Sequence, residues 1–333
     1  MYSIHSKAHT EETILARGLH KSFGATRVLS GVDLTVPAGT LQALLGPNGS
    51  GKTTAVRILT TLLAADAGAA TVGGHDVARE GAAVRRAIGL TAQQATVDAL
   101  LTGRENLELF ACLYHLGRGE ARRRASGLLE RFDLAAAADR RVATYSGGMR
   151  RRLDLAASMV SAPRILFLDE PTTGLDPRSR AELWSVIREL LASGTTILLT
   201  TQYLEEADHL ADRIAVINGG RIVADDTPEA LKRQIGSERL ALRLAHSGDL
   251  PRAAALLAGD LDPSWGGAPA DDGAPLPGTS LDAGTREITL AVRNPDHLRR
   301  ILDALHRAGV AVERVELRTP TLDDVFFELT AAA

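Results

Sequence analysis

A glycine-rich loop at residues 46–54 constrains this chain more than any other feature. It reads Gly46, Pro47, Asn48, Gly49, Ser50, Gly51, Lys52, Thr53 and Thr54. The apolar run Leu41–Leu45 before the loop predicts a buried strand, and Ala55–Leu63 after it predicts a helix. Glycines let successive backbone N–H groups point into one concavity, and a helix start adds more N–H groups and a partial positive charge. The loop is therefore predicted to bind phosphate groups.

Two side chains at the end of the loop extend this prediction. Lys52 can reach the β- and γ-phosphates of a nucleotide, while the hydroxyl of Thr53 can complete the ligand shell of a Mg²⁺ ion. The alternative is a glycine-rich turn with an incidental lysine. The spacing, the preceding strand and the following helix together favour the phosphate site.

A second apolar strand, Ile165–Leu168, ends in two adjacent carboxylates, Asp169 and Glu170. Open α/β sheets place their ligand sites at the carboxyl ends of such strands. Neighbouring side chains on a strand point in opposite directions, so the two should have different roles. We predict that Asp169 holds Mg²⁺, directly or through water, and that Glu170 lies nearer the water that attacks the γ-phosphate. A polar strand end without a chemical role is the alternative.

Residues from Thr102 to about Val160 show helical spacing of apolar side chains, which predicts a helical subdomain inserted into the α/β core. Its last helix opens with Ser146, Gly147 and Gly148. A serine and two glycines at a helix start form a second anion-binding terminus, far along the chain from the first.

Two further residues are candidates for ligand contacts. Phe23 lies at a turn between two predicted strands and could stack on a base, although a core phenylalanine is the alternative. Gln93 follows the strand-like run Ala87–Leu90, and its amide could contact Mg²⁺ or the attacking water. A loop residue without a role fits Gln93 equally well.

The chain has 333 residues, of which 45% are hydrophobic, and this suffices for about two domains. Its formal net charge of -3 does not indicate a nucleic-acid partner held by bulk electrostatics. The arginine clusters 122–124 and 150–152 are interpreted as solvated helix faces. No apolar run approaches the about 18 residues needed to span a bilayer.

The lone cysteine, Cys112, excludes an intrachain disulfide and a cysteine metal cluster, which suits a reducing cytoplasm. We interpret it as a small buried apolar residue. Residues 1–13 are polar and include His5 and His9, and we expect a disordered tail there instead of a metal site.

Taken together and in this order, these segments resemble the nucleotide-binding subunit of ATP-binding-cassette (ABC) transporters over about residues 14–235. The resemblance implies an α/β P-loop NTPase core with an antiparallel β subdomain and an inserted helical subdomain. The segments that resemble family motifs are the Walker A loop (Gly46–Thr54), the Q-loop glutamine (Gln93), the signature (Tyr145–Met149), Walker B (Ile165–Glu170) and the D-loop (Gly174–Asp176).

The resemblance also implies a chemistry and an assembly. ATP and Mg²⁺ are the implied cofactors, and Asp176 is the implied D-loop aspartate. Two cassettes, whether two copies of this chain or this chain and a related one, would pair head to tail. Each ATP would then lie between one Walker A loop and the partner's Ser146, Gly147 and Gly148. A separate membrane permease and a peripheral place at the cytoplasmic face of the membrane are implied as well.

Two positions depart from the family pattern. The signature reads Tyr-Ser-Gly-Gly-Met where the consensus is Leu-Ser-Gly-Gly-Gln, and the phosphate-facing part is intact. Gln202 stands where most members have a switch histidine that contacts the γ-phosphate. A glutamine amide donates a hydrogen bond but cannot become cationic or carry a proton, so we expect slower turnover or a stronger dependence on Glu170.

The stretch Thr200–Asp208 is similar to the daunorubicin/doxorubicin-resistance subgroup of drug exporters. We therefore expect an ATPase that energises drug or antibiotic efflux. The alternatives are an ABC ATPase for lipid or polysaccharide export and a soluble regulatory ABC ATPase that acts on ribosomes or DNA.

The expected domains are an ATP-binding domain at 14–236, with a helical subdomain at about 100–160, and a small α+β domain at 237–333. Within the latter, residues 251–284 are rich in Ala, Gly, Pro and Asp and are expected to form a mobile insertion. The C-terminal domain carries no catalytic constellation. Its end, Pro320–Phe326, is similar to the accessory domain of the drug-exporter subgroup.

Overall fold

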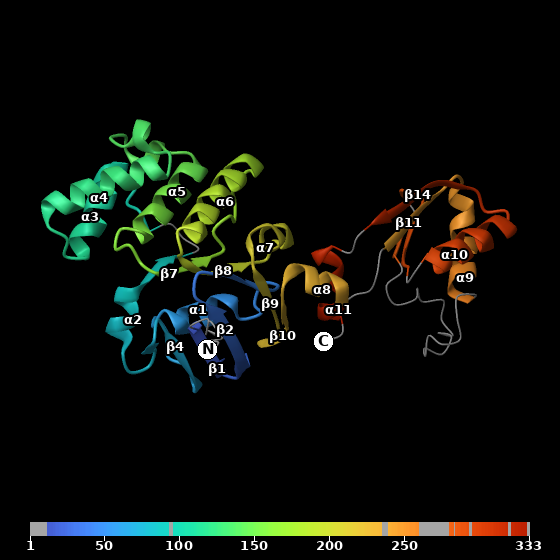
Figure 1. The fold of residues 1–333 in the computed structure, drawn as a ribbon, viewed down its shortest axis with the longest axis horizontal. Helices are drawn as coiled ribbons and strands as arrows, with labels where there is room; N and C mark the ends of the chain where they lie inside the picture. Colours follow the sequence, from blue (N-terminus) through green and yellow to red (C-terminus); the bar gives the residue numbers. More distant parts are fainter. Residues whose placement is uncertain are drawn as a thin grey trace, which may run out of the picture. The chain divides into compact units, whose positions relative to one another are not determined.

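The computed structural model describes residues 12–92, 96–234, 239–259, 280–282, 284–292, 295–318 and 321–331. It divides into two compact units, the first reaching Pro228 and the second beginning at Glu229 (Figure 1). This division lies before the boundary expected at 236, because most of helix α8 (Pro228–Gln234) belongs to the second unit. In the described residues, no helix combines the length and the apolar character that a bilayer span requires.

The first unit is built on a six-stranded sheet in the order β10-β9-β3-β8-β7-β6. Strand β3 pairs in parallel with β8 and β9, β7 pairs in parallel with β6 and β8, and only β10 is antiparallel to its neighbour. Three carboxyl ends, those of β3, β8 and β7, are therefore adjacent at one edge of the sheet. The strands are β3 (Leu41–Leu45), β6 (Ile88–Thr91), β7 (Ile165–Asp169), β8 (Thr196–Thr201), β9 (Arg213–Asn218) and β10 (Arg221–Asp226).

The predicted antiparallel β subdomain is a second sheet, in the order β2-β1-β4-β5. Its strands are β1 (Glu12–Phe23), β2 (Thr26–Pro37), β4 (Ala67–Val72) and β5 (His75–Asp76), with α2 (Gly81–Ala87) following. Leu19 and Leu29 of this sheet share a core with Leu59, which lies on helix α1 (Lys52–Leu59) directly after the glycine-rich loop. Residues 12 and 13, placed in the N-terminal tail above, belong to β1, and residues 1–11 lie outside the described residues.

The helical subdomain contains α3 (Gly103–Leu113), α4 (Arg118–Arg131) and α5 (Gly147–Ser158), with 3-10 turns η1 (Ala135–Ala137) and η2 (Val142–Thr144). Thr102 starts α3 through a capping box, in which its side chain and that of Glu105 each bond the other's backbone N–H. The subdomain shares its core with α6 (Pro177–Ala192), and α7 (Leu204–Leu210) follows β8. The α/β P-loop core with both subdomains is confirmed.

The interpretation of Cys112 as a buried residue is wrong. Leu107 and Ala111, four positions apart on α3, form the buried face of that helix. Cys112 lies one position further, so its side chain is rotated out of this face and is exposed.

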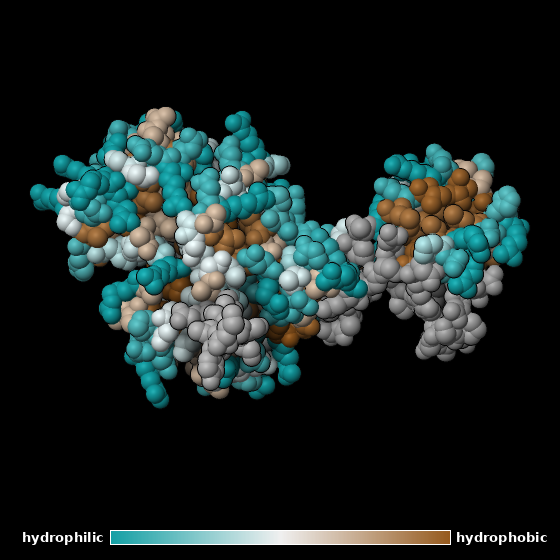
Figure 2. Space-filling model, in the orientation of Figure 1, coloured by the Kyte–Doolittle hydropathy of each residue, from teal (hydrophilic) through white to brown (hydrophobic). Residues whose placement is uncertain are grey.

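The second unit packs helices on one face of an antiparallel sheet in the order β12-β13-β11-β14. Leu240 and Leu242 of β11 are buried in one core with Ile301 and Leu305 of α10. The edge strand β14 leaves Val315 and Leu317 partly exposed, and Figure 2 shows an apolar area over β11 and β14. The elements are β11 (Arg239–Leu244), η3 (Ser247–Asp249), α9 (Leu250–Gly259), β12 (Ser280–Asp282), β13 (Glu287–Ala291), α10 (Pro295–Arg307), β14 (Val312–Arg318) and α11 (Leu322–Ala331).

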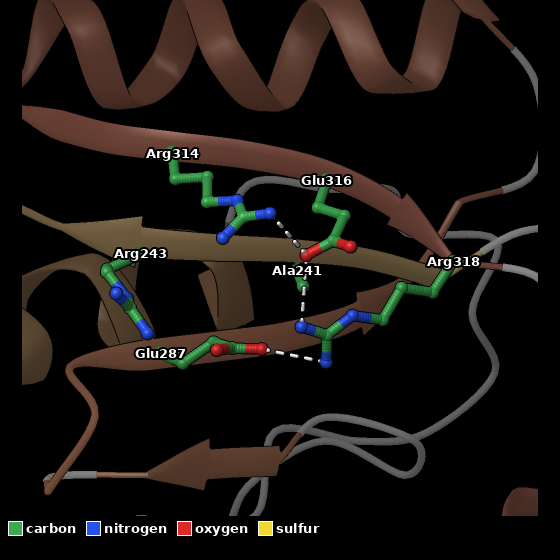
Figure 3. Close-up of a pocket in the computed structure, with 6 residues that line it drawn as sticks. All are labelled: Ala241, Arg243, Glu287, Arg314, Glu316 and Arg318. Carbon is green, nitrogen blue, oxygen red and sulfur yellow. Dashed lines mark hydrogen bonds and ion pairs between the residues drawn. The ribbon is translucent and has the colours of Figure 1, made fainter.

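The opposite face of this sheet is polar. Arg318 pairs with Glu287 at 3.0 Å and with Glu316 at 3.1 Å, and Arg314 and Arg243 complete a ring of charged side chains around Ala241 (Figure 3). These charges largely compensate one another, so this face has the character of a solvated sheet surface.

The ends of the stretch expected as a mobile insertion, 251–284, have regular structure. Helix α9 covers Leu250–Gly259 because Leu250, Ala253 and Leu257 recur at helical spacing and join the core of the second unit. Strand β12 begins at Ser280 and pairs with β13. Residues 260–279 lie outside the described residues.

Candidate nucleotide-binding site

The glycine-rich loop follows β3 and leads into α1, as predicted. Gly49 and Gly51 have φ angles of +81° and +111°, a backbone region that favours glycine. A Cβ atom added at Gly46 would collide with the carbonyl oxygen of Ile217. The loop therefore requires glycine at several positions, and the first turn of α1 opens directly from it.

Lys52 connects the loop to the carboxylates at the sheet edge. Its side chain is 4% exposed, and its ammonium group donates to the carbonyls of Gly46 and Pro47 at 2.8 and 3.0 Å. The same nitrogen lies 3.5 Å from Oε1 of Glu170. Burial lowers the pKa of Lys52, while the nearby Glu170 and Asp169 carboxylates oppose that shift. A buried cation held at this place is suited to an anionic ligand.

Asp169 and Thr53 meet at the same edge although they are far apart in the sequence. The hydroxyl of Thr53 donates to Oδ1 of Asp169 at 3.2 Å, and the hydroxyl of Thr200 donates to the same oxygen at 2.5 Å. A carboxylate and a hydroxyl oxygen side by side are the hard ligands that Mg²⁺ takes, so these residues fit the ion. Gln93, the third predicted metal contact, lies outside the described residues.

Glu170 has an unusual backbone. Its φ angle is +50°, in the left-handed region that residues other than glycine rarely adopt. Its N–H group donates to the carbonyl and to the hydroxyl of Thr200, each at 3.1 Å, and its side chain is buried. This turn directs the Glu170 carboxylate towards Lys52 instead of continuing the strand.

Gln202 lies at the sheet edge of the predicted site, and Phe23 lies at the end of a strand of the antiparallel sheet. Gln202 follows the last residue of β8, which places it at the same sheet edge, and its side chain is half-buried. Phe23 ends β1 with a 50% exposed ring, so the core alternative for this residue is excluded. The ammonium group of Lys21 lies 5.7 Å from the centre of the Phe23 ring.

The helix start at Ser146, the second predicted anion-binding terminus, is capped by its serine. Ser146 is the N-cap of α5 and accepts a hydrogen bond from the backbone N–H of Met149 at 3.2 Å. Ser146 and Gly147 are exposed, whereas Gly148 is buried against Ser179, where an added Cβ would lie 2.5 Å from the hydroxyl oxygen. Asp176 caps α6 and accepts from the N–H of Ser179 at 3.0 Å. The D-loop and the signature are thus packed together through Ser179.

Two charged residues on α5, Arg151 and Asp154, are buried although the sequence pattern did not indicate it. Arg151 was interpreted as part of a solvated helix face, and this is wrong, because it is 8% exposed. It donates to Asp154, one turn along the helix, and to backbone carbonyls on other elements. Burial raises the pKa of Asp154, and the bonds from Thr96 and the charge of Arg151 oppose that rise. The available signal was the spacing of Arg151 and Asp154, which lie three positions apart and therefore on the same face of α5.

Two family models match the chain. The one described as ABC transporter matches residues 29–173, and the one described as ATP-binding protein DrrA1-3-like, C-terminal domain, matches residues 227–330. Daunorubicin resistance ATP-binding protein DrrA2 of Streptomyces coeruleorubidus is 53% identical over 317 residues, which are 95% of this chain and 94% of that protein. Nod factor export ATP-binding protein I of Ralstonia nicotianae is 41% identical over 72% of this chain and 74% of its own length.

Among solved structures, the fold is similar to the ATP-binding cassette MJ0796, described as a dimeric post-hydrolysis state bound to ADP and Pi. The TM-score is 0.59 with 25% identity, over 64% of this chain and 98% of that one. Sequence and fold agree over the first unit, and the second family model covers the rest. The chain therefore belongs to the ATP-binding subunits of ABC transporters, which are ATPases, and within them to the daunorubicin/doxorubicin-resistance group.

Proposed function

We propose that this chain hydrolyses ATP at the edge formed by β3, β8 and β7, and that hydrolysis energises efflux of a drug or antibiotic through a membrane permease on another polypeptide. The observation that carries the catalytic part is the convergence of Lys52 with Glu170, and of Thr53 with Asp169. A cation and two carboxylates with different partners are what phosphoryl transfer to water requires.

Each residue has a separate role in this proposal. The ammonium group of Lys52 exchanges its contacts with the loop carbonyls for the β- and γ-phosphates of ATP. Thr53 and Asp169 would hold Mg²⁺, which when bound neutralises charge on the phosphate oxygens. Glu170 orients the attacking water and accepts its proton as the bond from the γ-phosphorus to ADP breaks. Gln202 donates a hydrogen bond to the γ-phosphate from its amide.

Pairing of two cassettes completes the proposed site. Ser146 and Gly147 lie exposed at the start of α5, where a second molecule's nucleotide can reach their N–H groups and hydroxyl. The dimeric, ADP-bound cassette with a similar fold supports this arrangement. ATP then acts as a shared ligand between two copies, and its hydrolysis loosens the pair.

A cavity of about 200 Å³ in the first unit supports a partner in the membrane. It lies between the helical subdomain and the region of α1, α2 and β6, and most of its lining is apolar. The residues around it are Thr60, Leu62, Arg85, Ile88, Leu90, Thr96, Phe110, Tyr114, Ala157 and Ser158. Leu62 is 62% exposed at its rim, and we propose that a cytoplasmic segment of the permease inserts its apolar side chains here.

This contact is tested by a matched pair of variants. Leu62→Glu should reduce co-purification of the chain with its permease at least about tenfold, because a buried charge opposes docking. Leu100→Glu introduces the same charge at a leucine that is 75% exposed and is not part of the cavity lining, and it should leave the complex intact. Equal binding by both variants would exclude the cavity as the docking site.

A drug as the transported substrate is supported by the relative named for daunorubicin resistance and by the matching C-terminal domain. The chain should confer daunorubicin resistance on a sensitive host when it is expressed with the membrane protein encoded beside it, and Glu170→Gln should abolish that resistance. We propose that the chain works peripherally at the cytoplasmic face of the membrane. Resistance without any membrane protein would favour a soluble regulatory ATPase instead.

The similarity to a Nod factor export protein supports an alternative in which the chain energises export of a molecule other than a drug. That relative covers a smaller share of this chain than the daunorubicin-resistance protein does. Export of such a molecule by reconstituted vesicles, with no effect of daunorubicin on the ATPase rate, would select this alternative.

A further inference from the structure

Helix α5, which begins at the signature, carries a buried pair of charges. Arg151 and Asp154 are 8% and 1% exposed, and Nη1 of the arginine lies 3.4 Å from Oδ2 of the aspartate. Removing two charges from water is costly, and such pairs rarely add stability compared with apolar residues of similar size. A buried pair at this place therefore requires an explanation other than stability.

The guanidinium group of Arg151 binds three consecutive carbonyl oxygens at the end of β7. It donates to the carbonyls of Asp169 at 3.2 Å, Glu170 at 3.1 Å and Pro171 at 2.7 Å. Successive carbonyls of a regular strand point in opposite directions, so they cannot meet one side chain. The left-handed backbone of Glu170 is what brings the three together, and Arg151 in turn stabilises that backbone.

The same pair binds both flanks of the segment that contains Gln93. Arg151 donates to the carbonyl of Ala92 at 2.7 Å. Asp154 accepts from the N–H and the hydroxyl of Thr96, at 2.7 and 2.6 Å. One turn of α5 thus contacts the chain on either side of residues 93–95.

We propose that Arg151 and Asp154 are positioning residues for ATP hydrolysis. They fix the Glu170 backbone relative to α5, the helix that begins at Ser146. A rotation of α5 would therefore shift the Glu170 carbonyl as well. This inference rests on the proposed role of Glu170. Nucleotide binding through Lys52 does not depend on the pair, so its loss should lower kcat and leave ATP affinity nearly unchanged.

The substitution Arg151→Lys tests this directly. Lysine keeps the charge but lacks the planar fork that reaches several carbonyls at once. In the purified full-length chain, kcat should fall at least about tenfold while the Kd for ATP changes by less than about threefold. Arg122→Lys is the matched control, because Arg122 is exposed on α4, and it should behave as the unmodified chain does. A kcat within about twofold of the unmodified value would overturn the proposal, as would equal losses of kcat and ATP affinity.

A milder variant covers the case in which Arg151→Lys fails to fold. Thr96→Val removes the hydroxyl bond to Asp154 and leaves both buried charges in place. It should lower kcat about threefold and the melting temperature by only about 2–4 °C, because one charge-assisted bond is lost while the bond from the Thr96 N–H remains. An unchanged kcat for this variant would count against the link through Asp154.

The Glu170→Gln variant separates this inference from the proposed function on which it rests. Full hydrolysis by Glu170→Gln would remove the proposed catalytic role and this inference with it. An inactive Glu170→Gln beside a fully active Arg151→Lys would overturn the positioning role alone.

Discussion

The two units of this chain place their charged side chains in opposite ways. In the first unit, Lys52, Asp169, Glu170 and Arg151 are buried together at the carboxyl edge of a parallel sheet. In the second, charged residues such as Arg318 line an outer sheet face and pair with one another (Figure 3). Buried charges are costly unless they serve a ligand or a neighbouring group, so the contrast locates the chemistry in the first unit.

The two sheets explain why this difference is possible. The parallel strands β3 and β7 are buried along their whole length, and the one charged residue in them, Asp169, stands where β7 ends. The antiparallel sheet of the second unit buries Leu240 and Leu242 on one face and leaves the alternate residues on the other. Charged residues of that sheet such as Arg314 and Arg318 on β14 therefore have solvated positions on the opposite face.

The largest effect should come from the first unit. Lys52→Ala removes the cation that we propose binds the phosphates, and ATP affinity should fall at least about 100-fold, equivalent to about 2.7 kcal/mol. Titration calorimetry with Mg-ATP measures this loss, and the melting temperature without nucleotide controls for folding. An unchanged affinity would remove the basis for placing the nucleotide at this loop.

A core substitution in the second unit should lower stability and leave ATP affinity unchanged. Ile301→Ala deletes buried methyl groups on α10 and should lower the free energy of unfolding of that unit by about 2–4 kcal/mol. Scanning calorimetry should show one transition at lower temperature, while ATP affinity stays as it was. If ATP affinity falls in parallel, the two units are coupled and the contrast between them is weaker than stated.

A buried acid in the first unit gives a smaller, pH-dependent effect. Burial raises the pKa of Glu206 on α7, against the polar groups of Thr201 and Thr172 and the hydrogen bond that Trp184 donates to it at 3.3 Å. In the unfolded chain Glu206 has its ordinary pKa, so it loses its proton at a lower pH than in the folded chain. Its contribution to the free energy of unfolding is therefore full below the ordinary pKa and is lost as the pH rises through the raised pKa. Glu206→Gln does not titrate, so the stability of this variant should fall less over that rise. Urea unfolding at pH 5 and pH 8 measures the difference, and parallel curves would argue against the shift.

The smallest effect should be that of Arg318→Ala. Its two ion pairs lie on the partly exposed face of the C-terminal sheet, so its loss should leave the free energy of unfolding nearly unchanged. Arg151→Met removes a buried arginine and leaves Asp154 buried without its cation. Urea unfolding of both variants compares the loss of an exposed arginine with the loss of a buried one. If Arg318→Ala lowers the free energy of unfolding as much as Arg151→Met does, then the ion pairs of the outer sheet face stabilise the fold as much as the buried ones.

Local sequence patterns were sufficient for much of the fold and of the site. The glycine spacing of 46–51 and the apolar run 165–168 are local signals, and each led to the right element and sheet edge. The start of α5 at Ser146 follows from the capping preference of serine. These features depend on neighbours in the sequence, which is why pattern reasoning finds them.

The remaining features depend on contacts between distant segments. The arginines at 150–152 look alike in the sequence, although Arg151 is buried against the end of β7. Sequence alone does not distinguish an exposed arginine from a buried one. The left-handed backbone of Glu170 and the exposure of Cys112 are likewise set by tertiary packing. Alanine-, glycine- and proline-rich composition concealed the amphipathic spacing of α9.

The most direct test of this account is the mass of Glu170→Gln in solution, measured by light scattering with saturating Mg-ATP. The amide keeps the size of the side chain and removes the proposed base, so ATP should stay bound between two copies. The account predicts twice the 35.3 kDa of one chain, and a return to 35.3 kDa when Ser146→Arg is added. A Glu170→Gln variant that binds ATP and still has the mass of one chain, with and without the permease, would contradict it.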